Sequence, residues 1–158
     1  MNDSPVAILV PVLLGTIYAT TTATNMCGKG IGKAVMRNFV HADLVHLTGN
    51  LATFWLLVNR LPLSSIKLLE LLGLLVVLTT GLDLMAQAVF PSLTCSIGFS
   101  GVLFGLLAWE VIRSDKVSWA ALGILVAMVV YPSLQNPRAS LVGHGLGAVA
   151  GVLASAII

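Results

Sequence analysis

Apolar residues along the chain fall into six long runs that short polar or charged clusters separate. The runs cover residues 5–24, 43–61, 66–90, 98–112, 117–131 and 140–158. A helix needs about 20 predominantly apolar residues to cross the hydrocarbon core of a bilayer, which is about 30 Å thick. The pattern therefore predicts an all-α, polytopic membrane protein in which six transmembrane helices form a single domain over residues 1–158.

Residues 25–40 interrupt this pattern. Two sets of residues share a four-residue spacing there, one apolar and one basic: Ile31, Val35 and Phe39, and Lys29, Lys33 and Arg37. Separate apolar and basic faces favour a short helix that lies in the plane of the membrane surface. Gly28, Gly30 and Gly32 weaken such a helix, so an irregular basic loop is the alternative.

The charge content supports the membrane interpretation. Only 9% of the 158 residues are charged, against about 25% in an average soluble domain. So few charges exclude an ordinary water-soluble enzyme, and the high apolar content excludes a disordered chain. The net charge of +2, without any basic run, gives no reason to expect a nucleic-acid partner. The lipid bilayer is the expected surrounding.

The fourth apolar run is too short to cross the bilayer. Its 15 residues would form a helix of about 22 Å, less than the hydrocarbon core. We therefore expect this helix to begin inside the membrane, after a stretch of non-helical backbone. Such backbone is tolerated where protein or a water-filled cavity surrounds it, so residues near Gly98 are predicted to line a cavity.

Polar side chains within the apolar runs are the candidates for chemistry, because burying them in hydrocarbon is costly. The chain has three histidines, His41, His46 and His144, and each lies in or beside an apolar run. His46 and Asn50 are four residues apart and share one helical face, so their donors are directed at one place. The alternative role for this pair is hydrogen bonding between helices.

A serine flanked by glycines stands at the predicted start of the short fourth helix, in Gly98-Phe99-Ser100-Gly101. Backbone N–H groups at a helix N-terminus are free, and the helix dipole there favours negative charge. Ser100 would therefore combine an exposed hydroxyl with donors for an oxyanion. A helix cap or a turn is the alternative explanation for this motif.

Small residues recur every four positions in the fourth and sixth runs, as Gly101 and Gly105 and as Gly143, Gly147 and Gly151. Such spacing allows two helices to approach closely. Ser100 precedes one series and His144 follows the first residue of the other. If the two series pack together, Ser100 and His144 face each other as a nucleophile and its general base would. Close packing around a buried, hydrogen-bonded histidine is the alternative.

These features together favour a Ser–His dyad. Asp83 and Glu110 are the only carboxylates within or at the edges of these spans that could complete a triad, and neither has a suggestive position. The chain has no H-E-x-x-H motif, so it lacks the ligands of a zinc metalloprotease. A three-histidine zinc site and an aspartyl dyad are weaker alternatives, and we expect neither a metal nor a cofactor. Whether Cys27 and Cys95 pair stays open at this point.

Three motifs in this order resemble those of the rhomboid intramembrane serine proteases: His41-x-x-x-x-His46-x-x-x-Asn50, Gly98-x-Ser100-Gly101, and His144-x-x-Gly147-x-x-x-Gly151. The resemblance implies that Ser100 is the nucleophile and that His144 is the general base. It also implies that His46, Asn50 and the Ser100 backbone N–H stabilise the oxyanion. His41 and the glycines of the motifs would support the site.

The sequence departs from the rhomboid pattern in two places. Phe104 stands where the family often has a tyrosine that packs on the catalytic histidine, so the aromatic face is kept without the hydroxyl. The segment between the first two runs also lacks the Trp-Arg pair that is common in the family. The chain resembles the compact six-helix form.

The resemblance further implies the substrates and the orientation in the membrane. Substrates would be transmembrane proteins that are cleaved at or near the membrane surface. The N-terminus would be cytoplasmic, and the active site would open to the opposite face. Charge alone does not set this orientation. The eight basic residues divide equally between the two sides, as Arg60, Lys67, Arg113 and Lys116 against Lys29, Lys33, Arg37 and Arg138.

Two alternatives to a protease stay open. One is a catalytically silent rhomboid-like protein that binds membrane clients, although such a protein usually lacks the serine or the histidine that this chain retains. The other, weaker alternative is a small membrane transporter whose polar residues line a pathway.

Overall fold

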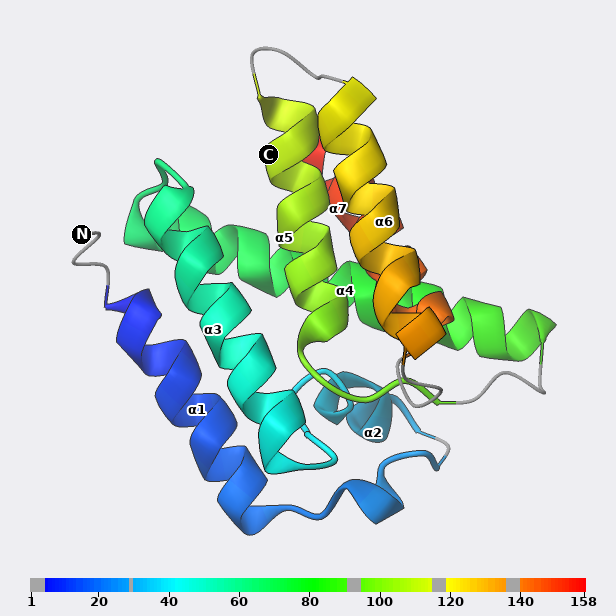
Figure 1. Ribbon diagram of the computed structural model, residues 1–158. Helices are drawn as coiled ribbons and strands as arrows, with labels where there is room; N and C mark the ends of the chain where they lie inside the picture. The colour runs from blue at the N-terminus through cyan, green and yellow to red at the C-terminus, as the bar shows by residue number, and fades with distance from the viewer. Residues whose placement is uncertain (1–4, 29, 91–94, 115–118, 136–139) are drawn as a thin grey trace.

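The computed structural model describes residues 5–28, 30–90, 95–114, 119–135 and 140–158, and in these ranges all regular elements are helices. In chain order they are α1 (Val6–Thr20), the 3₁₀ turn η1 (Ala23–Asn25), α2 (Ile31–Met36), α3 (Leu44–Arg60), α4 (Ser65–Val89), α5 (Ser100–Arg113), α6 (Trp119–Gln135) and α7 (Leu141–Ser155) (Figure 1). Each predicted apolar run contains one long helix, and the predicted all-α class is confirmed for the described residues.

One of the described helices, α4, is both long and apolar enough to cross a membrane by length and composition. Shorter apolar helices occupy Val6–Thr20, Ala121–Tyr131 and Leu141–Ser155. The short helix α2 lies within the basic segment 25–40, where a helix and an irregular loop were both expected. The six spans themselves stay a prediction.

Several helix boundaries differ from the sequence prediction: α1 ends at Thr20 and α7 at Ser155, each a few residues early, and two other differences have a clear physical reason. The fourth long helix begins at Ser100 rather than at Gly98, because Gly98 has a φ of 111°, in a region that favours glycine and that no α-helix uses. Helix α6 continues through Pro132 to Gln135, so the predicted stop at Tyr131 is wrong. Neighbouring groups in membrane helices can satisfy the backbone that a proline frees, so a proline need not end such a helix.

Polar side chains cap three of the helices. The Asp43 carboxylate accepts a hydrogen bond of 2.8 Å from the His46 N–H at the start of α3. Ser140 Oγ accepts one of 2.9 Å from the Gly143 N–H at the start of α7, and Ser64 caps α4 in the same way. Such caps satisfy backbone donors and define where each helix starts. They therefore set the positions of His46 and His144 on their helices.

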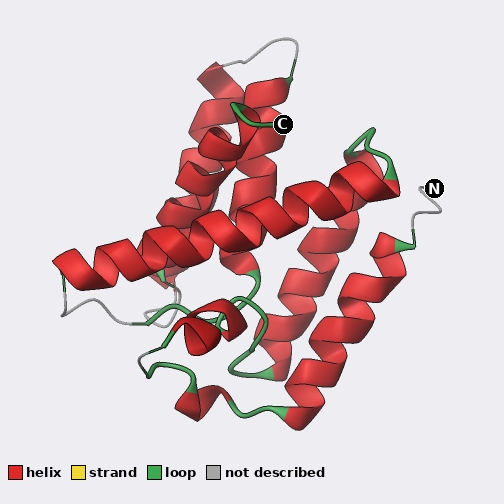
Figure 2. Ribbon diagram, turned by 180° about the vertical axis from the view of Figure 1, so that it is seen from behind, coloured by secondary structure: helices red, strands yellow, loops and turns green. Residues whose placement is uncertain are grey.

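The helices form two groups that α4 connects. In Figure 1, α1 and α3 run side by side, while α5, α6 and α7 stand together; Figure 2 shows α4 lying across both groups from behind. A buried apolar core fills the centre and includes Phe54, Leu75, Phe99 and Leu106. Large apolar side chains are also exposed on the outer faces of α1, α4 and α6, an arrangement that suits contact with lipid rather than water.

The closest helix pair is α5 and α7, which meet backbone to backbone. A methyl group added at Gly147 would collide with the Gly101 carbonyl and lie 2.8 Å from the Gly101 Cα. A methyl group added at Gly151 would likewise collide with the Gly105 carbonyl. The two glycine series therefore pack against each other, as their four-residue spacing predicts.

Substituting Gly147→Ala should destabilise the protein strongly, whereas Gly145→Ala should not. The added methyl group at position 147 has to push α5 away, and overpacking of this kind costs about 1–3 kcal/mol or more. Gly145 lies on the same helix, and nothing is within 4 Å of a methyl group added there. Thermal unfolding in detergent micelles measures both variants, and equal melting temperatures would contradict the close α5–α7 contact.

Candidate active site

A large cavity with a volume of about 1820 Å³ is lined by residues from each of the helices α2 to α7. Four polar residues that the sequence singles out line it: His46 and Asn50 from α3, Ser100 from α5, and His144 from α7. One cavity is thus lined by residues that lie far apart in the chain.

The glycine contact between α5 and α7 brings Ser100 and His144 to the same part of this cavity. A methyl group added at Gly101 would lie 3.5 Å from the Gly143 carbonyl oxygen, so these two backbone positions are neighbours. Ser100 is the residue before Gly101, and His144 is the residue after Gly143. Both side chains line the cavity beside this point of contact.

The His144 side chain is 8% exposed and packs against an aromatic ring. The centres of the His144 and Phe104 rings are 4.5 Å apart, and the ring planes are inclined by 35°. His144 Nδ1 is buried and has no hydrogen-bond partner among the described residues. Packing on Phe104 and a backbone interaction with Val129 of α6 hold the imidazole, and no described carboxylate is bonded to Nδ1.

Helix α5 begins without the kind of cap that starts α3, α4 and α7. Its N-cap residue is Phe99, and among the described residues no side chain caps this end. Backbone N–H groups of the first turn are then free of side-chain acceptors, beside Ser100 and the cavity. This end of α5 is suited to bind a developing negative charge.

The segment that leads into α5, residues 95–99, is called the nucleophile loop after the role that the sequence predicts for Ser100. His46 packs directly on it, because a methyl group added at Gly98 would collide with His46 Cε1 and lie 2.6 Å from His46 Nε2. Gly98 also has the positive φ noted above. A glycine is therefore required here both for the backbone conformation and for the approach of the imidazole.

His41 connects Asn50 to the nucleophile loop. Its Nε2 lies 2.8 Å from Asn50 Nδ2 and 3.5 Å from the Phe99 N–H, while Nδ1 lies 3.0 Å from the Phe39 carbonyl oxygen. This pattern suits a neutral ring in which Nδ1–H donates to Phe39 and Nε2 accepts from Asn50. His41 therefore orients the amide of Asn50, which is itself only 6% exposed.

Burial lowers the pKa of His41 to about 4, and the nearby His46 adds to the effect. The Phe39 carbonyl and the Asp43 carboxylate oppose this shift in pKa, but they are the smaller influences. His41 is thus neutral at physiological pH, which the proposed acceptor role of Nε2 requires.

The two carboxylates that could complete a catalytic triad each pair with an arginine. Asp83 lies 3.3 Å from Arg37, and Glu110 lies 3.4 Å from Arg60. Among the described residues, no three His, Cys, Asp or Glu side chains are grouped so that they could hold a metal ion.

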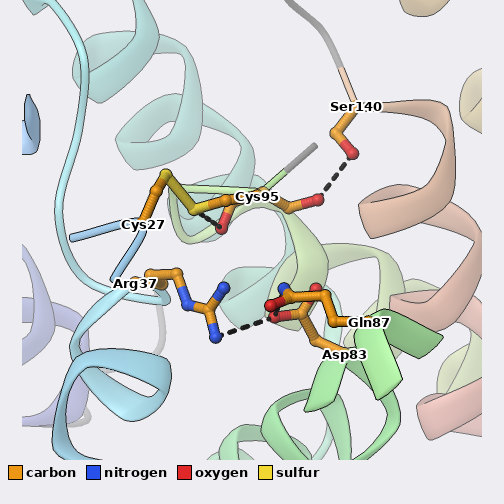
Figure 3. The surroundings of a disulfide bond; sticks show 7 residues. Cys27, Arg37, Asp83, Gln87, Cys95 and Ser140 are labelled. Carbon is orange, nitrogen blue, oxygen red and sulfur yellow. Dashed lines mark hydrogen bonds and ion pairs between the residues drawn. A yellow bond between two sulfur atoms is a disulfide. The ribbon is translucent and has the colours of Figure 1, made fainter. Parts of the chain in front are cut away.

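Three restraints on the nucleophile loop were not predicted from the sequence, and Figure 3 shows two of them. Cys95 forms a disulfide with Cys27, and Ser96 Oγ lies 2.6 Å from Ser140 Oγ, which caps the helix of His144. The Gly98 N–H donates to the Arg37 carbonyl over 2.8 Å. The presence of two cysteines in the chain is the one sequence signal for these restraints. A single serine or a backbone hydrogen bond leaves no recognisable pattern in a sequence.

Comparison with known proteins connects this geometry to one family. The sequence matches the rhomboid domain over residues 30–158. A protein of Acanthamoeba polyphaga mimivirus that is provisionally named a rhomboid protein is 29% identical over 148 residues, which cover 92% of this chain and 86% of the viral protein. No solved structure matches the chain significantly.

The stability of the folded protein should decrease as the pH falls from about 6.5 towards 4. The unfolded chain takes up a proton on His41 near the ordinary pKa of 6.5, but the folded protein resists it until the pH approaches about 4. The contribution of His41 is therefore complete above pH 6.5 and is lost on acidification. Melting temperatures in detergent at pH 7.5 and 4.5 measure this loss. His41→Gln should lose less on acidification, and an equal loss in both proteins would contradict the assignment.

Proposed function

The chain belongs to the rhomboid family, and from this premise we propose that it is an intramembrane serine endopeptidase that uses Ser100 and His144 as a catalytic dyad. One observation carries the proposal. The backbone contact between Gly101 and Gly143 lies beside both side chains, and both line one cavity. A nucleophile at an uncapped helix start, with an imidazole beside it, is the arrangement that acyl transfer needs.

In this mechanism His144 acts as the general base. A ring nitrogen takes the proton from Ser100 Oγ while Oγ attacks the scissile carbonyl carbon, and the imidazolium then gives that proton to the leaving amine. The peptide bond breaks, and an ester to Ser100 remains until water hydrolyses it. Packing against Phe104 restricts the ring, in place of the carboxylate that orients the histidine in a triad.

The oxyanion would be stabilised from two sides of the cavity. Backbone N–H groups of the first turn of α5 approach from one side, and the side chains of His46 and Asn50 approach from α3. The Asn50 NH2 group has two N–H donors. One of them binds His41 Nε2, so the other is left for the oxyanion. One donor of this type typically contributes about 2.7–4 kcal/mol to transition-state stabilisation.

The proposed substrates are transmembrane protein segments cleaved at or near the membrane surface. The exposed apolar faces of α1, α4 and α6 support a location in the bilayer, where the six long helices would each form a span. The cavity lies among helices and is lined by both apolar and polar residues, so it suits an unwound peptide and a water molecule. No cofactor takes part in this chemistry.

The disulfide supports the orientation that the family resemblance implies. Disulfides form and persist in oxidising compartments. Cys95 belongs to the nucleophile loop, and the disulfide holds Cys27 at that end of the molecule. This end would therefore face the non-cytoplasmic side, and the N-terminus would be cytoplasmic. Because the basic residues divide equally between the two sides, the disulfide is the feature that favours this orientation in the membrane.

A fluorophosphonate should label the purified wild-type protein but not the Ser100→Ala variant. His144→Ala should slow labelling by a factor of about 10²–10⁴, because the serine loses its base. Ser155→Ala is the matched control: this serine lies at the far end of α7 and donates to the Val152 carbonyl, so labelling should not change. Active-site labelling followed by gel electrophoresis measures all four proteins.

Absence of labelling in the wild type, or equal labelling of Ser100→Ala, would contradict the protease mechanism. Cleavage of a transmembrane reporter protein then separates an enzyme from its alternatives. A silent membrane-client binder would retain the reporter uncut, and a transporter would carry solute without forming a covalent adduct.

A further inference from the structure

The nucleophile loop is attached to the segment around α2 at two points. The first is the covalent bond between Cys95 and Cys27, which lie 68 positions apart in the sequence and 5.5 Å apart between Cα atoms. The second is the hydrogen bond from the Gly98 N–H to the carbonyl of Arg37. Because Cys27 precedes α2 and Arg37 follows it, both ends of the α2 segment hold the nucleophile loop.

The α2 segment is itself anchored to α4 by buried polar groups. The Arg37 guanidinium, which is 4% exposed, lies 3.3 Å from the Asp83 carboxylate, and Gln87 donates to the same carboxylate over 2.9 Å (Figure 3). Next to Arg37, the Asn38 amide donates to Thr80 Oγ1 over 2.9 Å and accepts from Thr79 Oγ1 over 3.1 Å. The disulfide therefore ties the nucleophile loop to a segment whose far end, at Arg37 and Asn38, is fixed to α4.

We propose that the Cys27–Cys95 disulfide is a positioning element for the proposed reaction, so that hydrolysis is fast in the oxidised protein and slower in the reduced one. This inference rests on the proposed serine protease function. Cys95 lies five residues before Ser100, and Gly98, on which His46 packs, lies between them. Movement of Cys95 would therefore displace both Ser100, the proposed nucleophile, and His46, a proposed donor to the oxyanion.

The chemistry of the switch is a thiol–disulfide exchange. A dithiol reductant supplies two electrons and two protons, the S–S bond breaks to leave two thiols, and the reductant becomes a cyclic disulfide. Cys27 is exposed and Cys95 is partly exposed, so a small thiol can reach the bond. After reduction, the Arg37–Gly98 and Ser96–Ser140 hydrogen bonds still hold the loop. We therefore expect a slower enzyme rather than an inactive one.

Oxidised, reduced and reoxidised wild-type protein in detergent should be compared with the Cys27→Ser/Cys95→Ser double variant. The measurements are the labelling rate of Ser100 by a fluorophosphonate, kcat and KM for a transmembrane reporter, and the melting temperature. A misplacement of about 1 Å can cost 10²-fold in rate, so we expect kcat and the labelling rate to fall by about 10- to 100-fold. KM should change little, and reoxidation should restore the rate.

Two features separate positioning from a merely structural role. A structural crosslink would lower the melting temperature but leave kcat unchanged well below it, whereas a positioning crosslink lowers kcat there too. The double variant should behave like the reduced wild type and should not respond to the dithiol, which controls for other effects of the reagent.

Three results would overturn the proposal. Equal labelling rates and kcat in the oxidised and reduced wild type would overturn it alone and leave the protease function intact. Free thiols on both cysteines in the protein isolated from a non-cytoplasmic face, shown by mass spectrometry, would do the same. No labelling in the oxidised protein would overturn the protease function and this proposal together.

Discussion

The backbone contact between α5 and α7 sets the distance between the two residues of the proposed dyad. Methyl groups have no room at Gly147 or Gly151, so the two helices cannot lie closer and have no side chains between them that could flex. At the other end of this contact Gly101 lies beside Gly143, and Ser100 and His144 are the residues next to these two glycines. The other residues of the site must then place hydrogen-bond donors for the oxyanion near the start of α5.

Hydrogen bonds among buried polar groups hold the segments around the start of α5 in place. His41 orients Asn50, Asn38 binds Thr79 and Thr80, and Arg37 pairs with Asp83. In an apolar surrounding these groups need partners, since an unpaired buried polar group costs free energy. Three buried side-chain atoms lack a partner among the described residues, namely Arg37 Nε, Glu110 Oε2 and His144 Nδ1, and all three residues line the cavity.

Part of this arrangement is predictable from the sequence because it repeats. The four-residue spacing of glycines indicates a helix contact, and that contact is found between Gly101 and Gly147. The shortness of the fourth apolar run likewise indicates a helix that starts late, and α5 begins at Ser100. Repeated patterns of this kind report on one face of one helix, which is local information.

The remaining contacts join residues that are far apart in the chain and occur once each. The sequence does not indicate Arg37 as the partner of Asp83, because Arg37 belongs to a basic segment that could form either a helix or a loop. The bond between His41 and Asn50 depends on how the chain turns before α3, and the disulfide depends on the approach of two loops. No periodic pattern in the sequence indicates such pairs, because only the folded chain brings their members together.

The central claim is that Ser100 and His144 act as one unit. A double-mutant cycle on reporter cleavage tests it most directly, by comparing Ser100→Ala, His144→Ala and the combined variant with the wild type. Groups that act as a unit give strongly non-additive losses, so each single variant should lose nearly as much activity as the combined one. Losses that multiply in the combined variant would show that the two residues act independently and would contradict the account.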